Sequence, residues 1–148
     1  LGVLGGVEYV DSVTGKTTWL NYWPGSNSVS VDTNHPVKAF VYDDPMQLYV
    51  VVADGTNTNR ATALADTFAN CDMASVNSGS TNTGMASDML DISSAATTNT
   101  LDVRIVGLFE DEGNSDYSAA GHQYIVRLNH PYNSGVGAAV GTFATTAI

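Results

Sequence analysis

Cysteine, basic residues and long apolar runs are all scarce in this chain of 148 residues. Its single cysteine, Cys71, has no partner for a disulfide within the chain, so the fold must depend on packing or on assembly. Neither neighbour, Asn70 or Asp72, would lower a thiol pKa, and we predict that Cys71 is a small buried side chain. No apolar run approaches the roughly 20 residues of a membrane-spanning helix. Residues 1–10 lack the basic start and cleavage-type end of a secretory leader, so we expect none there.

Positive charge is scarce as well, and this scarcity excludes two classes of partner. Five Lys and Arg residues stand against fifteen Asp and Glu residues, which gives a formal net charge of −10. We therefore predict that the chain binds neither nucleic acid nor an anionic membrane, because both require a basic surface. The acidity either serves solubility alone or favours docking on a basic surface. Charged residues make up only 14% of the chain, and the resulting polar, weakly ionic surface suits an extracellular or particle-bound protein.

The residues that usually carry catalysis or metal binding do not form a recognisable motif. Two of the three histidines, His35 and His130, lie in Asn-His-Pro tripeptides, and the spacing typical of zinc ligands is absent. Asp43 and Asp44 are adjacent, so on a strand they would point to opposite faces, and Asp44 is better placed to cap a turn. We predict no catalytic residue, no metal site and no cofactor.

An acidic stretch near residue 110 is the remaining candidate for a metal ligand set. Glu110, Asp111, Glu112 and Asp116 supply oxygen ligands of the kind that calcium prefers, but their order does not match the EF-hand loop. We predict an acidic surface loop over residues 110–121.

Aromatic residues, by contrast, are concentrated near the N-terminus. Six of them precede Pro45, and both tryptophans lie within residues 19–25. Trp and Tyr are enriched both in cores and at the energetic centres of interfaces. The rings of Trp19, Tyr22 and Trp23 therefore either fill the core of a hairpin or anchor a contact with another protein.

Short β-type segments separated by turn residues predict an all-β fold, a single β-barrel or β-sandwich of about six to eight strands. Residues 7–10 and 17–22 are expected to form one hairpin, and residues 37–43 and 46–53 a second. Further strands are expected at residues 85–92, 101–109 and 123–128, with at most one short helix near 60–69.

The expected organisation is one β domain with extended ends. Residues 1–10 are assigned to an N-terminal arm and first strand, residues 7–132 to the single β domain, and residues 133–148 to a C-terminal tail. Extended arms of this kind can add a strand to the sheet edge of a neighbouring protein.

The order of several short motifs is familiar. In series, the chain contains Gly6-Val-Glu-Tyr-Val-Asp11, Tyr22-Trp-Pro24, Lys38-Ala-Phe-Val-Tyr-Asp-Asp-Pro45, Ala53-Asp-Gly55 and Asn70-Cys-Asp72. Taken together with the strands around Arg104 and Arg127, this pattern resembles a family of small head-associated proteins of tailed bacteriophages, the capsid decoration or cement proteins. The resemblance covers most of residues 3–132.

This resemblance implies a virion structural protein without enzymatic activity, assembled in the host cytoplasm and located on the capsid surface. Such a protein binds the outside of the head, bridges major capsid protein subunits and associates with other copies of itself, as a dimer or trimer. The expected interface residues are Leu1, Val3, Leu4, Trp19, Tyr22, Trp23, Pro24, Tyr42, Asp44 and Pro45.

Two other functions remain open. A tail or fibre component of the same virion would also be rich in β structure and poor in lysine. A secreted carbohydrate-binding module would use exposed Trp19 and Trp23 as a platform for sugar rings.

Overall fold

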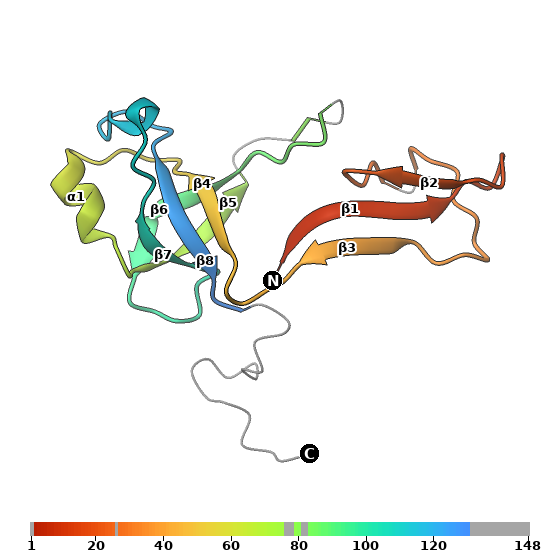
Figure 1. The fold of residues 1–148 in the computed structure, drawn as a ribbon, viewed down its shortest axis with the longest axis horizontal. Coiled ribbons are helices and arrows are strands. Elements are labelled where there is room, and N and C mark those ends of the chain that lie inside the picture. Colours follow the sequence, from red (N-terminus) through yellow and green to blue (C-terminus); the bar gives the residue numbers. More distant parts are fainter. Residues whose placement is uncertain (1, 26, 76–78, 81–82, 131–148) are drawn as a thin grey trace, which may run out of the picture. The chain divides into compact units, whose positions relative to one another are not determined.

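The computed structural model describes residues 2–25, 27–75, 79–80 and 83–130, and over these residues the all-β prediction is confirmed (Figure 1). The described strands are β1 (Val3–Val10), β2 (Thr17–Leu20), β3 (Lys38–Tyr42), β4 (Leu48–Val52), β5 (Asn70–Ser75), β6 (Asp88–Ala96), β7 (Val103–Leu108) and β8 (Gln123–Leu128). One α-helix, α1 (Arg60–Ala65), and one short 3-10 helix, η1 (Glu112–Asn114), complete the described elements. The expected C-terminal tail over 133–148 lies outside the described residues.

The chain divides into two compact units. The small-sheet unit comprises the described residues of 2–42 and 78–86, and the large-sheet unit comprises those of 43–77 and 87–130. Each unit has one open antiparallel sheet, and neither sheet closes into a barrel. The assignment of residues 7–132 to a single domain stays a prediction, because it concerns whether the two units fold together.

The small-sheet unit has the strand order β2-β1-β3, with β1 in the middle. The predicted hairpin of β1 and β2 is confirmed, with Val7 opposite Leu20 and Val10 opposite Thr17. Its turn is held by Asp11, whose Oδ1 accepts hydrogen bonds from the backbone N–H of Thr14 at 2.8 Å and of Val13 at 2.9 Å. These donors stabilise the charged carboxylate and lower the pKa of Asp11.

The N-terminal residues form a strand where the sequence predicted an arm. β1 begins at Val3, four residues before the expected start, and pairs with β3 from Val3 onwards. A β-bulge between Leu4 and Gly6 interrupts this pairing, which explains why the alternation of apolar residues is hard to recognise there.

The large-sheet unit has the strand order β4-β8-β7-β5-β6. The second predicted hairpin is wrong, because β3 pairs with β1 whereas β4 pairs with β8. The turn between them exists, and Asp44 caps it by accepting a hydrogen bond from the N–H of Met46 at 2.8 Å. A short turn between two strands does not decide which strands they pair with, because each strand can pair equally well with a strand that is distant in the sequence.

One face of the large sheet forms the core. Val103 and Ile105 on β7 face the core with Tyr124, Val126 and Leu128 on β8, all at most 7% exposed. Strand β7 lies within the predicted range 101–109, and a β-bulge between Ile105 and Gly107 ends the alternation that begins with Val103 and Ile105. The boundaries predicted for β8 match. Strand β5 was not predicted, because residues 70–75 alternate weakly between small, acidic and apolar side chains.

Helix α1 lies at the predicted place and is short. Asn59 caps its N-terminus by accepting a hydrogen bond from the N–H of Thr62 at 3.1 Å. Ala63 is its buried residue. In the part of the chain that the structure describes, no helix has the length and apolarity needed to cross a membrane.

Cys71 is fully buried, as predicted, and burial raises the pKa of its thiol to about 11. The nearby Asp66 carboxylate makes the second contribution to this shift, because it disfavours a thiolate. We expect iodoacetamide to alkylate the folded protein near pH 8 at least about 100-fold more slowly than a free cysteine, because the thiolate fraction falls tenfold for each unit of pKa. Mass spectrometry of the timed reaction measures this rate, and the urea-unfolded chain is the positive control. Alkylation of the folded protein at the rate of the unfolded chain would contradict this prediction.

Candidate interaction surface

Three aromatic rings are exposed on one face of the small sheet. The side chains of Trp19 on β2 and of Phe40 and Tyr42 on β3 are 57%, 47% and 64% exposed. The strand register places them together: Gly6 lies opposite Phe40, Glu8 lies opposite both Trp19 and Lys38, and Val3 lies opposite Tyr42. Residues directly opposite on paired strands project to the same side of a sheet. We call Val3, Trp19, Phe40 and Tyr42 the aromatic face.

Two glycines allow the rings of Trp19 and Tyr42 to approach the backbone of β1 closely. A Cβ atom on Gly6 would stand 2.3 Å from Cζ2 of Trp19, and one on Gly5 would stand 2.6 Å from Cε2 of Tyr42. Any side chain at either position would therefore displace a ring from the sheet. Glycine at these positions is required by the close approach of ring to backbone.

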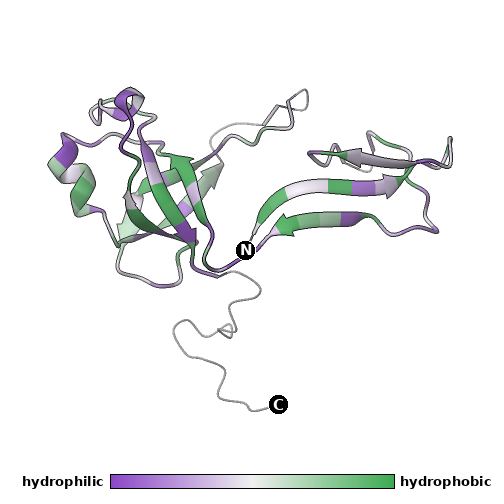
Figure 2. Cartoon of the chain, viewed as in Figure 1, coloured by the Kyte–Doolittle hydropathy of each residue, from purple (hydrophilic) through white to green (hydrophobic). Residues whose placement is uncertain are grey.

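A shallow apolar depression of about 550 Å³ lies beside these rings, lined by Gly5, Trp19 and residues 39–42. At its border the Lys38 ammonium pairs with Glu8 Oε1 at 2.8 Å, so the two charges on this face neutralise each other. Figure 2 shows the apolar residues that run along β1 and β3 in this unit. The surface therefore offers apolar contact with little net charge.

The opposite face of the small sheet is packed only in part, since Leu4 and Val41 on that face are 45% and 50% exposed. Val7 and Tyr9 are 2% and 6% exposed, and the Trp23 ring meets the edge of the Tyr9 ring at a centroid distance of 6.1 Å. Asn21, just after β2, donates a hydrogen bond from Nδ2 to the carbonyl of Thr83 at 3.0 Å. The small-sheet unit thus buries Val7 and Tyr9 on one face of its sheet and leaves the rings of the aromatic face largely exposed on the other.

The structure brings together some of the predicted interface residues and separates others. Val3, Trp19 and Tyr42 share the aromatic face. Leu4 projects to the other side of β1 and is 45% exposed, whereas Trp23 packs on Tyr9.

The remaining predicted interface residues lie outside the aromatic face. Tyr22 and Pro24 are half-buried beyond the end of β2. Asp44 and Pro45 belong to the large-sheet unit, where Asp44 serves the turn, and Leu1 lies outside the described residues.

Phe40 is the member of the aromatic face that is absent from the predicted interface residues. The signal was available, since Phe40 and Tyr42 are two residues apart on a predicted strand and must share a face. The two glycines under the rings could not be found this way, because their role depends on the pairing of β1 with β2 and β3.

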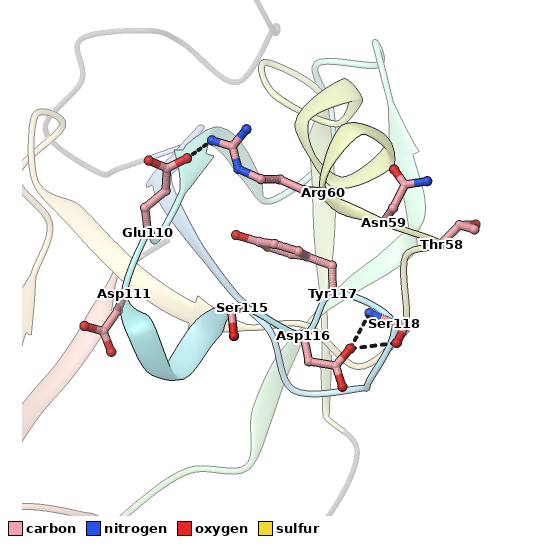
Figure 3. A pocket seen from close by; sticks show the side chains of 9 residues that line it. All are labelled: Thr58, Asn59, Arg60, Glu110, Asp111, Ser115, Asp116, Tyr117 and Ser118. Atoms are coloured by element: carbon pink, nitrogen blue, oxygen red, sulfur yellow. Dashed lines mark hydrogen bonds and ion pairs between the residues drawn. The ribbon is translucent and has the colours of Figure 1, made fainter.

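A second depression, of about 640 Å³, lies in the large-sheet unit and is polar (Figure 3). Arg60, at the start of α1, forms an ion pair with Glu110 on the opposite side of the depression. The Tyr117 side chain lies between the segments that carry these two residues. Asp116 accepts hydrogen bonds from the hydroxyl and the N–H of Ser118 at 2.6 and 3.1 Å, and these donors lower its pKa. The side chains that line the depression are thus largely engaged in holding the loop 110–118 in shape.

A buried polar cluster lies beneath α1. Asn57 Nδ2 donates to the hydroxyl of Tyr124 at 2.8 Å, and that hydroxyl lies 3.2 Å from Oδ2 of Asp66. His122 is 3% exposed, and its ring lies at 5.1 Å from the ring of Tyr124. Burial, followed by the Asp66 carboxylate, raises the pKa of the Tyr124 phenol. Asn57, His122 and Tyr124 are buried and Asp66 is half-buried, and their polar groups satisfy one another within the large-sheet unit.

Among the described residues, no group of three or more His, Cys, Asp or Glu side chains is placed to hold a metal ion. Comparison with protein-family models, with curated proteins and with solved structures finds no significant match.

Proposed function

We propose that this chain is a virion structural protein, a capsid decoration protein that binds the outer surface of a phage head and bridges major capsid protein subunits. It makes and breaks no covalent bond. The observation that carries the proposal is the aromatic face, where three large rings remain exposed on one side of the small sheet.

Exposed aromatic residues at the centre of an apolar patch are typical of the energetic centres of protein interfaces. The rings of Trp19 and Tyr42 already lie close to the backbone of Gly6 and Gly5, so these two rings lose little conformational freedom when a partner covers them. Strand β3 adds a second means of attachment. It is an edge strand, and all five of its residues are exposed. A strand from a shell protein or from another copy can pair with its free edge.

The distribution of charge supports docking through the small-sheet unit. That unit carries three acidic residues and two lysines, a formal charge of −1, whereas the large-sheet unit carries twelve acidic residues and three arginines, a formal charge of −9. The small-sheet unit therefore brings little net charge to a contact made through the aromatic face, while the acidity of the large-sheet unit favours solubility.

The experiment that tests this function is co-sedimentation of the purified chain with undecorated heads and, separately, with isolated tails from the same virion. We expect saturable binding to heads and none to tails. Binding to tails alone would support a tail or fibre component instead. A glycan array tests the carbohydrate-binding alternative, for which Trp19 and Trp23 are poorly placed because they lie on opposite faces of the small sheet.

A further inference from the structure

Two arginines stand side by side on the outer face of the large sheet. Arg104 on β7 lies directly opposite Arg127 on β8 in the antiparallel register. Their sequence neighbours Val103, Ile105, Val126 and Leu128 face the core, so both arginines project away from it. Like charges at directly opposed positions of an antiparallel pair are destabilising, because the side chains start about 5 Å apart.

Among the described residues, neither arginine forms an ion pair with a carboxylate within 4.0 Å. The ion pairs of the described residues involve His35, Lys38 and Arg60, and neither Arg104 nor Arg127 is among them. Asp102 precedes Arg104 by two residues, but its Oδ2 accepts a hydrogen bond from the N–H of Met73 at 3.3 Å. Two adjacent arginines without such an ion pair are notable in a unit with a formal charge of −9.

Phe68 adds a second unfavourable feature at the same place. Its backbone is in the left-handed region, with φ of 72°, where a residue other than Gly or Asn is strained. Its ring is 65% exposed, and the guanidinium carbon of Arg104 lies 5.5 Å from the ring centroid. This cation–π contact orients the Arg104 guanidinium on the outer face.

The surroundings of the arginines are apolar on the side of β4 and polar on the side of β5. Leu48 lies opposite Arg127 and is 48% exposed, and Val50, two pairs further along β4, is 51% exposed opposite Ile125. On the other side, Asn70 on β5 lies opposite Arg104. A ligand on this face therefore meets two guanidinium groups beside aliphatic side chains. Guanidinium groups bind carboxylates through paired, charge-assisted hydrogen bonds.

We propose that this face, which we call the arginine face, binds a short extended segment of a partner protein that carries carboxylates among apolar residues. Charge complementarity favours this occupant, since one or two carboxylates satisfy the unpaired guanidinium groups. A nucleic acid or another polyanion would be repelled by the other charges of the unit. The proposal stands on a different unit from the aromatic face and does not depend on the partner being a capsid protein.

The test uses a model peptide, Ac-Val-Asp-Val-Asp-Val-NH2, in which alternate carboxylates project to one side of an extended chain. Titration into the full 15N-labelled chain at low salt is followed by NMR. We expect chemical-shift changes confined to β7, β8, β4 and Phe68, with Arg104 and Arg127 side-chain signals shifting most. The matched peptide Ac-Val-Asn-Val-Asn-Val-NH2 should bind about tenfold more weakly, because it lacks the charge-assisted bonds.

Protein variants locate the site. Arg104→Gln and Arg127→Gln should each weaken binding of the Asp peptide several-fold, whereas Arg60→Gln, which removes an arginine paired with Glu110, should leave it unchanged. Equal binding of the Asp and Asn peptides would overturn the proposal, as would shift changes elsewhere on the chain. Inorganic phosphate that binds as tightly as the Asp peptide would also overturn it, because the apolar neighbours would then contribute nothing.

A stability measurement separates binding from a structural role. Arg127→Glu should raise the Tm while abolishing peptide binding, because it converts a repulsive cross-strand pair into an attractive one. A lower Tm for Arg127→Glu would show that the arginine supports the fold, and would overturn the proposal. None of these readouts involves phage heads, so the two proposals can fail independently.

Discussion

Replacing both Trp19 and Tyr42 by threonine should weaken attachment of the chain to undecorated heads by at least about 100-fold. Each substitution removes an exposed ring from the aromatic face, and loss of an aromatic anchor at the centre of an interface costs about 2 kcal/mol or more. Threonine is suited to strands because it is β-branched, so the pairing of β2 and β3 with β1 should persist. Quantitative co-sedimentation over a range of chain concentrations measures the loss.

The matched control is Val13→Thr in the turn of the same hairpin. Val13 is 80% exposed, yet it lies outside the aromatic face, so its replacement should leave binding unchanged. Circular dichroism and the fluorescence of the remaining Trp23 verify that the doubly substituted small sheet is folded. Full binding by a folded Trp19→Thr, Tyr42→Thr variant would show that the aromatic face is not the docking surface.

Leu90→Ala should lower the free energy of unfolding by about 2–5 kcal/mol. Leu90 on β6 is fully buried in the core of the large-sheet unit, and its carbonyl accepts a hydrogen bond from the N–H of Asp54 at 3.0 Å. Truncation removes favourable apolar burial and leaves a cavity that the packed sheet cannot close. Urea unfolding followed by circular dichroism measures the change.

The control for this experiment is the same substitution at a more exposed leucine. Leu64 on α1 is 39% exposed, and Leu64→Ala should cost less than about 1 kcal/mol because alanine also favours the helix. Equal losses for the two variants would contradict the assignment of Leu90 to the core.

The Leu90→Ala variant also tests the predicted single domain. Both tryptophans belong to the small-sheet unit, so their fluorescence reports that unit alone. If residues 7–132 fold cooperatively, the fluorescence midpoint falls together with the circular dichroism midpoint. A fluorescence midpoint that does not move would show two independently folding domains.

Local sequence determined much of the secondary structure. Strand β8 was predicted at its observed boundaries, and β7 within the range 101–109, because the alternation of side chains along a single strand is a local property. The helix near residue 60 and the turn at Asp44 were also predicted, since each depends on a side chain that caps neighbouring backbone groups.

Strand partners and the aromatic face were decided only by the tertiary structure. The pairing of β3 with β1 and of β4 with β8 depends on contacts between residues far apart in the chain, which no local pattern encodes. The same pairing places Trp19 over Gly6 while Trp23, four residues later, packs against Tyr9 on the other face. It also sets Arg104 opposite Arg127, although 22 residues separate them in the sequence. The sequence by itself determined which residues are apolar, aromatic or charged, and the register of the two sheets decided which of them meet.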